Sequence, residues 1–558
     1  AAADEQSFTR KKHDSSLPEN AIHWALQREG ITINDIEAIA FYDKPFVKFE
    51  RILKSHVNNF PHSLPQFIKA MPSWFSTKLR LRKILRKELG YQGPVCFGEH
   101  HLSHAASSFF ASGWDQAAIL TVDGVGEWAT TTWGVGNGNT IEVKSEIRFP
   151  HSLGLLYSAM TAYLGFKINS GEYKVMGLAP YGEPKYIERI KKLITIKDDG
   201  SFRLSMKYFT FDYALRMYNT EFEKVMGAPT RGVDEGDIEQ FHKDVARSLQ
   251  EVVNEVMVKL VRNIVKKTGQ KKLCLAGGVA LNCVANGHIL RETSVEEIFI
   301  QPAAGDNGAA MGAALWLWHQ VLDNERVWKF DNAYLGPEYT EIQIRKVLDQ
   351  YGAVYHKYER EDLLEQTAAL LESSLVVGWH QGRLEWGPRA LGHRSILGDA
   401  RHIEMREIIN VKIKMREGFR PFAPTVLEED IQDYFNLDCT SPYMLLVAPV
   451  KESIINSENP LPSITHVDGS ARVQSINREQ DAMYYDLLST FKKRTGCSVL
   501  INTSMNVRGE PMVNTPEDTY RCFMRTQMDA VVIGPFLLRK DEQPRIDLPS
   551  AQEEFGLD

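Results

Sequence analysis

Residues 117–149 read AAILTVDGVGEWATTTWGVGNGNTIEVKSEIRF, and this stretch decides the expected fold. Its first apolar run ends at Asp123 and Gly124, and two further runs rich in β-branched residues are separated by the turn residues NGN. Runs of this composition, bounded by turn residues, predict a strand followed by an antiparallel hairpin.

Helical patterns follow this hairpin along the chain. Between Asp244 and Lys267 the apolar residues recur every three or four positions, and Gly269 follows as a helix cap. The next stretch, KLCLAGGVALN, predicts a short buried strand that breaks at Gly277 and Gly278 and turns into another helix. Strands that alternate with helices predict an α/β fold.

The length of 558 residues is too great for one hydrophobic core, so we expect two domains. The composition shifts through DNERVWKFDNAYLGPEY, residues 323–339, which resembles an interdomain passage. We place the main boundary near residue 350. The remainder predicts a separate α/β domain, because a helix (EDLLEQTAALLESS) leads into a strand (LVVGW).

Composition narrows the class of protein. With 43% hydrophobic and 25% charged residues, the chain is neither fibrous nor wholly disordered. A formal net charge of −7 argues against binding to nucleic acid, so any phosphate site must be local. Six cysteines without a CxxC pair predict reduced thiols. The chain shows no signal peptide and no apolar run of about 18 residues, so we expect a cytoplasmic protein with no membrane partner.

Two histidines and two aspartates are candidates for a metal site. The stretch EHHLSHAASSFFAS predicts a helix on which His100 and His104 lie one turn apart on one face. An isolated HxxxH pattern more often belongs to ordinary surface or core residues. Here Asp123 follows a buried strand and Asp306 opens a helix in AAGDNGAA, where α/β folds place ligands. Together they predict a transition-metal site with open positions, whose metal the ligands do not specify.

Glycines and cations mark two further candidate sites. The Gly277-Gly278 turn before a helix allows a ligand to approach the backbone, although such a pair is more often only a tight turn. In the second domain, cationic and short polar side chains interleave with Trp, Pro, Gly and Phe, which predicts a pocket for a small phosphate. These side chains are Arg383, Arg389, Arg394, Arg401, Lys412, Lys414, Arg416, Arg420, Asn502, Ser504, Asn506 and Arg508.

A third basic stretch, KLRLRKILRKEL at residues 78–89, could suggest binding to RNA or to a membrane surface. It contains six basic residues but no aromatic residue that could stack on bases. We therefore favour a solvated, basic amphipathic helix on the surface.

Motifs along nearly the whole chain identify a family. The sequence resembles the carbamoyltransferases of natural-product and nodulation-factor biosynthesis. The matching stretches, in order along the chain, are FTRKKHD, EHHLSHAASSFFAS, LTVDGVGEW, SLGLLYSAMTAYLGF, GEYKVMGLAPYG, AGGVALNC, GDNGAAMGAA, GRLEWGPRALGHRSIL, KMREGFRPFAP, DGSARVQSINRE and INTSMNVRGEP.

The resemblance implies an α/β protein of two domains. Residues 1–350 would form an actin/Hsp70-type (ASKHA, Kae1-like) ATPase domain that binds metal and ATP and carries out carbamoyl transfer. Residues 351–558 would form a smaller YrdC-like domain for carbamoyl phosphate, similar to those that make threonylcarbamoyl adenylate for tRNA, and its last residues could pack back on the first domain. Family members usually begin with a strand hairpin bearing a His-Asp motif beside the acceptor site, which we expect this chain to lack.

The resemblance also implies roles for single residues. The implied metal ligands are His100, His104, Asp123 and Asp306. The implied nucleotide-binding residues are Lys12, Gly277, Gly278, Val279 and Asn282. The implied carbamoyl phosphate contacts are Arg389, Lys414, Arg416, Arg472, Ser504 and Asn506. The implied catalytic residues are His100, His104, Asp123, Lys414 and Arg416.

The implied reaction is ATP-dependent O-carbamoylation. Carbamoyl phosphate is taken apart in the small domain, the carbamate is activated with ATP as carbamoyl adenylate, and the carbamoyl group passes to a hydroxyl of a small-molecule acceptor near the metal. The implied cofactors are ATP with Mg²⁺ and one transition metal, Fe²⁺ by resemblance, with Zn²⁺ and Mn²⁺ as alternatives. A homodimer is compatible with the resemblance. Using an unstable carbamate within one protein keeps water away from it.

Other functions remain open at this point. A tRNA-modifying enzyme would need a basic surface for RNA. A non-catalytic ATP-binding scaffold would need neither the metal site nor the phosphate pocket. A metallohydrolase would leave the arginine-rich domain unexplained. The acceptor could be an aminoglycoside, a cephem, a macrolide-like scaffold, an oligosaccharide or a guanidinium alkaloid. We expect its determinants between Lys185 and Asp237.

Overall fold

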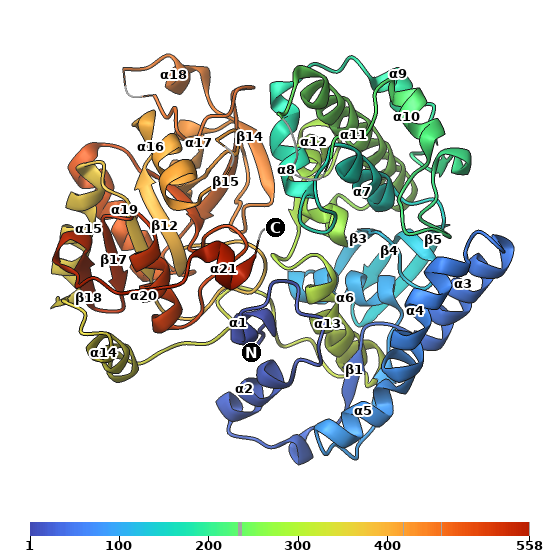
Figure 1. The fold of residues 1–558 in the computed structure, drawn as a ribbon, viewed down its shortest axis with the longest axis horizontal. Coiled ribbons are helices and arrows are strands. Elements are labelled where there is room, and N and C mark those ends of the chain that lie inside the picture. The colour runs from blue at the N-terminus through green and yellow to red at the C-terminus, as the bar shows by residue number, and fades with distance from the viewer. Residues whose placement is uncertain (233–236, 417, 459, 557–558) are drawn as a thin grey trace. The chain divides into compact units, whose positions relative to one another are not determined.

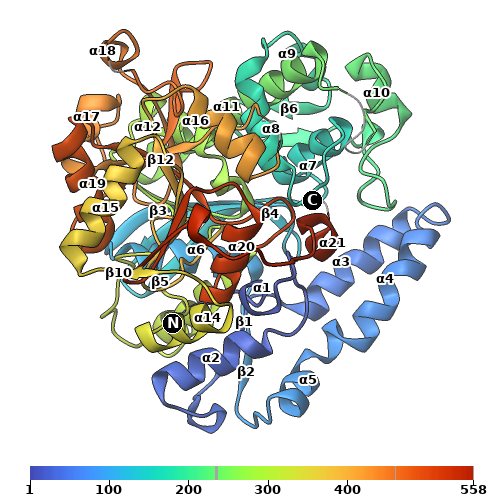
Figure 2. The same ribbon diagram turned by 60° about the vertical axis from the view of Figure 1, so that its left-hand side comes forward.

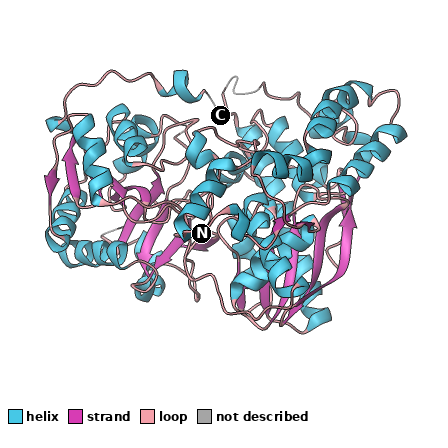
Figure 3. Ribbon diagram, turned by 90° about the horizontal axis from the view of Figure 1, so that it is seen from below, coloured by secondary structure: helices cyan, strands magenta, loops and turns pink. Residues whose placement is uncertain are grey.

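The computed structural model describes residues 1–232, 237–416, 418–458 and 460–556. It has a mixed α/β architecture, and helices lie around sheets in two compact units (Figure 1, Figure 3). Unit 1 comprises Ala1–Gly30 and Asp331–Asp558, and unit 2 comprises Ile31–Phe330. Each unit is treated below by itself.

Unit 2 is built on a sheet of five described strands. β3 pairs antiparallel with β4, which pairs antiparallel with β5, whereas β3, β8 and β9 run parallel. In their order across the sheet, the strands are β5 (Thr140–Arg148), β4 (Ala129–Asn137), β3 (Gln116–Val122), β8 (Lys272–Ala276) and β9 (Glu297–Phe299). The predicted strand and antiparallel hairpin are therefore confirmed. Two smaller pairs are β1 (Ile39–Phe41) with β2 (Val95–Phe97) and β6 (Ile194–Ile196) with β7 (Phe202–Leu204).

The described helices of unit 2 include both helices that the sequence predicts most clearly, α6 and α11. Gly269 caps α11 in the left-handed conformation, as predicted. The helices are α3 (Pro45–Asn58), α4 (Leu64–Ser76), α5 (Leu81–Glu88), α6 (His100–Ser112), α7 (Leu153–Tyr163), α8 (Glu172–Leu178), α9 (Ile187–Ile190), α10 (Thr220–Met226), α11 (Gln240–Thr268), α12 (Cys283–Glu292) and α13 (Asp306–Leu315).

The core of unit 2 holds α6 in place. Phe109 and Phe110 are fully buried in a cluster that also contains Ile119 of β3 and Ile141 of β5. On another side α6 packs against α13, where a Cβ at Gly312 would lie 1.9 Å from a backbone oxygen of α6. Helix α6 begins at His100 and helix α13 begins at Asp306. The packing of the two helices therefore places these two residues close together.

Unit 1 contains, within the described residues, a sheet of nine strands. Their order is β10 (His356–Lys357), β18 (Phe536–Arg539), β17 (Ala530–Ile533), β11 (Val377–His380), β12 (Arg394–Asp399), β16 (Val499–Ser504), β13 (Ala423–Leu427), β15 (Ser470–Ile476) and β14 (Leu446–Pro449). The helices are α1 (Gln6–Thr9), α2 (Glu19–Glu29), α14 (Glu341–Gln350), α15 (Arg360–Glu372), α16 (Glu404–Glu407), α17 (Ile431–Tyr434), α18 (Glu452–Ile455), α19 (Ala482–Thr495), α20 (Pro516–Arg525) and α21 (Ala551–Phe555).

The division into units differs from the predicted boundary at residue 350 in two ways. Residues 331–350 belong to unit 1, because Trp386 and Leu384 donate backbone hydrogen bonds to Ala333 and Pro337. Residues 1–30 also belong to unit 1, where Arg10 binds a loop about 500 residues further along the chain. Sequence patterns detect neither connection, because both join segments that are distant in the chain.

The C-terminal helix packs within its own unit. Glu554 of α21 forms an ion pair of 2.8 Å with Arg521 and a second pair with Arg525, both on α20. The prediction that the last residues could pack back on the first domain stays a prediction. Among the described residues, no helix has both the length and the apolar character needed to cross a bilayer.

Candidate functional site

The carboxyl ends of the parallel strands of unit 2 meet at one edge of its sheet. Asp123 directly follows β3, and the Gly277-Gly278 turn directly follows β8. The loop after β9 leads to Asp306 at the first position of α13. Ligand sites of open α/β sheets lie at this edge, because the loops that leave the strands converge there.

Helix α6 adds two imidazoles to this edge. His100 and His104 are buried, and their Nε2 atoms lie 3.1 Å apart. The His100 Nε2 lies 3.1 Å from Asp123 Oδ2, and the His104 Nε2 lies 3.5 Å from Asp306 Oδ1. One ligand atom from each of these four residues lies within 4.8 Å of the other three. The structure thus brings together the four residues that the sequence predicts as metal ligands.

A carboxylate that the sequence analysis missed orients His100. Asp43 Oδ1 lies 2.9 Å from His100 Nδ1, and the Lys48 ammonium donates to Asp43 Oδ2 at 2.7 Å. Glu127 accepts hydrogen bonds from the backbone N–H groups of His100 and Lys44. With Nδ1 bonded to Asp43, the Nε2 atom of His100 faces the cluster. The signal in the sequence was IAFYD, an apolar strand ending in Asp, which is the same pattern as in LTVD.

The electrostatics of the cluster suit a cation. Burial disfavours protonation of His100, but its bonds to Asp123 and Asp43 outweigh burial and raise its pKa to about 10. Burial likewise opposes ionisation of Asp123, yet the bond from His100 and the neighbouring imidazoles hold its pKa well below its ordinary value. Two imidazole nitrogens and two carboxylates are a donor set that divalent transition metals accept, so the residues present fit such an ion.

The glycine turn contacts this cluster directly. Gly277 has φ +92°, and a Cβ at this position would lie 2.3 Å from the backbone oxygen of Val122. The Gly278 N–H donates to Asp123 Oδ1 at 2.8 Å. A single carboxylate therefore contacts both the backbone of the turn and an imidazole of the cluster.

Asn282, predicted to bind nucleotide, has its side chain engaged within the fold. It is buried, its oxygen accepts from Ala285 N as the cap of α12, and its amide donates to Gln250 at 3.1 Å. Val279 lies in the short 3₁₀ turn between Gly277 and Asn282. Lys12 is an exposed residue of unit 1. The part of this set that adjoins the cluster is the backbone of the glycine turn.

Unit 1 contains a second polar cluster. The Lys414 ammonium is buried and donates to the backbone oxygen of Ser504 at 2.6 Å, and it also bonds Asn506 Oδ1. The Ser504 hydroxyl donates to the same Asn506 oxygen at 2.8 Å. Burial, followed by the charge of Arg416, holds the Lys414 pKa well below its ordinary value. The structure thus connects Lys414, Ser504 and Asn506, three of the predicted carbamoyl phosphate contacts, by direct hydrogen bonds.

The backbone around Lys414 departs from regular structure. A π-helical turn at Ile408–Ile413 immediately precedes it, and Met415 has φ +51°. Arg416 follows, and its Nε donates to Asn410 Oδ1 at 2.8 Å. π-turns and left-handed residues other than glycine are frequent at functional sites, because such conformations persist only where the surroundings hold them.

Several side chains that were predicted for the phosphate pocket form bonds within the fold. Arg394 is fully buried, and its guanidinium donates to the backbone oxygens of Asn514 and Gln381. Arg401 forms a bidentate pair with Asp399. Arg383 donates to the backbone oxygen of Leu335 at 2.9 Å, and the Asn502 amide donates to Gln474 at 2.8 Å within the sheet. The pocket prediction is corrected for Arg394 and Asn502, because both are buried and hydrogen-bonded within the fold. Arg383 and Arg401 are half-buried, and their place in the pocket stays a prediction.

The remaining predicted side chains of the pocket differ in exposure. Lys412 is exposed on the π-turn. The other predicted arginines are half-buried, and they are Arg389, Arg420, Arg472 and Arg508. Arg472 lies on β15, two strands from β16, which carries Ser504.

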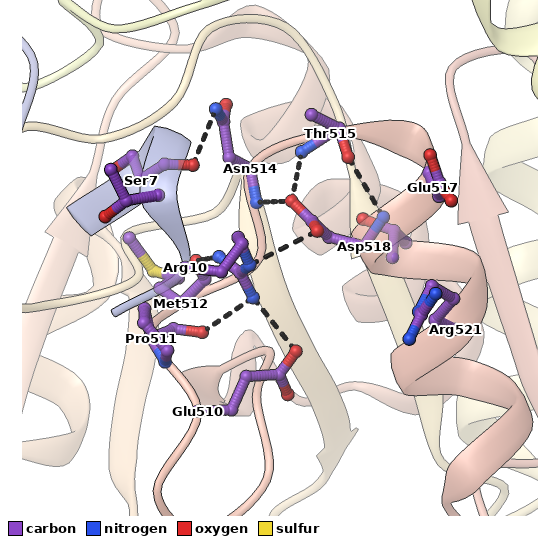
Figure 4. A network of polar contacts seen from close by, with 12 residues as sticks. Ser7, Arg10, Glu510, Pro511, Met512, Asn514, Thr515, Glu517, Asp518 and Arg521 are labelled. Atoms are coloured by element: carbon purple, nitrogen blue, oxygen red, sulfur yellow. Dashed lines mark hydrogen bonds and ion pairs between the residues drawn. The ribbon is translucent and has the colours of Figure 1, made fainter. Parts of the chain in front are cut away.

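The N-terminal segment stabilises the loop that carries Asn506. Figure 4 shows Arg10 directed at residues 510–518, where it forms an ion pair of 2.9 Å with Glu510 and a second of 3.2 Å with Asp518. The Asn506 amide donates to the Glu510 backbone oxygen at 2.7 Å. The FTRKKHD motif thus supports the Lys414 cluster through its arginine, a role that sequence reasoning missed because the two segments lie at opposite ends of the chain.

The segment predicted to determine acceptor choice, Lys185–Asp237, contains α9, the β6–β7 hairpin and α10. It packs on α11, since the Tyr186 N–H donates to the buried Ser248 hydroxyl at 2.9 Å. Its residues 233–236 lie outside the described residues.

Comparison with protein families decides the class of this chain. Residues 1–315 match the model described as the carbamoyltransferase N-terminus, and residues 368–540 match the carbamoyltransferase C-terminus. The chain belongs to the carbamoyltransferase family. As a member it is an enzyme that transfers a carbamoyl group, and the predicted resemblance is confirmed.

Relatives cover the chain to different extents. An uncharacterized protein of Synechocystis, sll1178, is 50% identical over 100% of this chain and 96% of its own length. Nodulation protein NolNO of Sinorhizobium fredii is 37% identical over 97% of this chain and 77% of its own. The 3'-hydroxymethylcephem-O-carbamoyltransferase of Streptomyces clavuligerus is 34% identical over 47% of each chain. Among solved structures, HypF of T. kodakarensis is 17% identical over 44% of this chain and 39% of its own, with a TM-score of 0.25.

Proposed function

We propose that this carbamoyltransferase moves the carbamoyl group of carbamoyl phosphate, through carbamoyl adenylate made with ATP, to a hydroxyl of a small-molecule acceptor. The family supports carbamoyl transfer, and the name of the cephem relative supports a hydroxyl as the acceptor. In this proposal unit 2 corresponds to the actin/Hsp70-type domain and unit 1 to the YrdC-like domain.

The observation that carries the nucleotide part is the shared Asp123 carboxylate. Its Oδ1 accepts from the Gly278 backbone and its Oδ2 contacts His100. A phosphate chain bound beside the turn would therefore lie next to the four-residue cluster. A scaffold protein would need no such junction between a glycine turn and a cation-binding cluster.

A divalent metal would be held by His100, His104, Asp123 and Asp306, and it would offset the charge of the phosphates. Asp43 orients one of the ligands, as its bond to His100 Nδ1 indicates. Glycine at position 277 allows the turn to pack against the backbone of Val122, which a Cβ would prevent, and this packing keeps the turn beside the cluster. The protein's own groups thus position the nucleotide.

The Lys414 cluster is the proposed carbamoyl phosphate site. Lys414 and Arg416 supply positive charge, while Ser504 and Asn506 supply short polar groups. Charge-assisted hydrogen bonds from such groups bind phosphate oxygens strongly. Because Lys414 is buried, a bound anion would interact with it through little intervening water.

The proposed steps balance. Water releases carbamate and phosphate from carbamoyl phosphate in unit 1. A carbamate oxygen then attacks the α-phosphorus of ATP, the bond to the bridging oxygen breaks, and pyrophosphate leaves. The acceptor oxygen finally attacks the carbamoyl carbon, its proton is lost, and AMP leaves.

Exchange of labelled pyrophosphate into ATP tests this mechanism without knowledge of the acceptor. We expect exchange that requires carbamoyl phosphate, because formation of the adenylate is reversible while pyrophosphate is present. Nucleotide chromatography should show AMP and no ADP. Formation of ADP, or carbamoylated product from a reaction without ATP, would contradict the adenylate step.

Replacing Asp43 should weaken metal binding. Asp43→Ala removes the acceptor for His100 Nδ1–H and should lower affinity for Co²⁺ or Zn²⁺ by on the order of tenfold, whereas Asp43→Asn should lower it less. Competition with a chromogenic chelator measures the affinity. Glu50→Gln, an exposed carboxylate seven residues away, is the matched control. Unchanged affinity in Asp43→Ala would exclude an orienting role.

A further inference from the structure

The α3–α4 hairpin of unit 2 exposes an apolar stripe. Its two helices lie side by side at the edge of the unit (Figure 1, Figure 2), and Phe49 of α3 contacts Trp74 of α4 with ring centroids 5.6 Å apart. Helix α4 exposes Leu64, Ile68 and Phe75 by 44%, 63% and 54%, although the Phe75 ring also contacts Phe49 at its edge. These residues, spaced at i, i+4 and i+11, lie along one face of the helix.

The end of α3 and the turn that follows it continue this exposed apolar surface. Val57 in the last turn of α3 and Phe60 in the turn are exposed by 73% and 69%, more than the three residues of α4. Soluble proteins rarely expose contiguous apolar surface of this kind unless it serves an interaction. We call Val57, Phe60, Leu64, Ile68 and Phe75 the apolar stripe.

The charge of this region is opposite to that of the chain. Residues 44–88 contain eleven Lys and Arg residues against two Glu, whereas the whole chain has a formal net charge of −7. On α5 the cations Lys83, Arg86 and Lys87 are exposed, while Leu85 is buried beneath them. Lys69, the residue after Ile68, adds an exposed cation to α4 beside the stripe.

We propose that α3, α4 and α5 form a docking surface for a bilayer that contains anionic lipid. Exposed apolar side chains can enter the boundary between headgroups and acyl chains, and neighbouring cations are attracted to the negative surface. The opposite charge of the region and of such a bilayer argues for this occupant. The surface lies entirely within unit 2, and the proposal is independent of the carbamoyl chemistry.

Other occupants fit these observations less well. In a symmetric dimer through this surface, the positively charged region of one copy would lie against the same region of the other copy, and the two would repel each other. A nucleic acid would be attracted by the cations but would leave the aliphatic stripe unused, and the stripe holds no exposed tryptophan or tyrosine. The sequence alone favoured a solvated helix at residues 78–89. It did not indicate the apolar stripe on the neighbouring helix α4, because the exposure of those side chains depends on tertiary packing.

Co-sedimentation of the full chain with vesicles tests this docking surface. We expect binding to vesicles of equal parts phosphatidylcholine and phosphatidylglycerol, weak binding to phosphatidylcholine alone, and loss of binding between about 0.05 M and about 0.5 M NaCl. Lys83→Glu with Arg86→Glu should weaken binding at least about tenfold. Ile68→Ser with Phe75→Ser should also weaken it about tenfold, even at low salt.

Matched variants elsewhere separate this surface from general effects. Lys346→Glu with Lys493→Glu changes the net charge equally at exposed positions of unit 1, and Val327→Ser with Ile342→Ser removes two other exposed apolar side chains. Both controls should bind as the parent does, with unchanged melting temperatures for all variants. Failure to bind mixed vesicles, or equal loss in the controls, would overturn the proposal. So would RNA binding without vesicle binding, or self-association that Ile68→Ser with Phe75→Ser abolishes.

Discussion

Removal of both imidazoles by His100→Ala with His104→Ala is expected to abolish stoichiometric metal binding and, with it, ATP-dependent carbamoyl transfer. The two Nε2 atoms, 3.1 Å apart, are half of the candidate ligand set, and the two remaining carboxylates cannot hold a transition metal selectively. Elemental analysis of the purified protein measures the metal, and pyrophosphate exchange measures activation of the carbamate.

The control for this variant must separate ligand loss from unfolding. His23→Ala with His62→Ala removes two exposed imidazoles and should retain both metal and activity. The single replacement His104→Gln keeps most of the side-chain volume in the buried site, and thermal melting reports on its fold. A double variant that folds and retains one metal ion per chain would show that the four-residue cluster does not bind the metal.

Lys414→Ala is expected to weaken carbamoyl phosphate binding by about ten- to a hundredfold, which corresponds to the loss of a charge-assisted hydrogen bond of about 1.5 to 3 kcal/mol. Binding of ATP should be unchanged, because the glycine turn lies in unit 2 and Lys414 in unit 1. Calorimetric titration with each ligand separately measures both affinities.

Lys412→Ala provides a close control for this effect. Lys412 lies two residues earlier in the same segment, but its side chain is exposed, whereas that of Lys414 is buried against Ser504 and Asn506. We expect Lys412→Ala to bind carbamoyl phosphate as the parent does. Equal loss in both variants would indicate a diffuse electrostatic effect, and parallel loss of ATP affinity in Lys414→Ala would indicate a shared site or unfolding.

Local patterns in the sequence determined the elements and placed most of the candidate metal ligands. The i, i+4 spacing placed His100 and His104 on one face of α6, and the apolar run before Asp123 placed this carboxylate at the end of β3. Both inferences succeed because helix and strand periodicity depend on residues that are neighbours in the chain. The pattern of cations and short polar residues indicated a phosphate pocket that includes Lys414, Arg416, Ser504 and Asn506, but only the family resemblance separated these four from the other cations.

Only the tertiary structure decided which partners the other polar side chains choose. Arg394, predicted from the sequence to bind phosphate, is fully buried and donates to backbone oxygens. Arg10 binds Glu510, which lies 500 residues further along the chain. Asp43 became part of the site because β1 ends beside α6. Leu64 and Phe75 of α4 are apolar but exposed, which depends on how α4 packs and cannot be seen in the sequence. Residue type and spacing define what a side chain can bind, but its partner is the group that folding brings within hydrogen-bonding or packing distance, and that depends on contacts between distant segments.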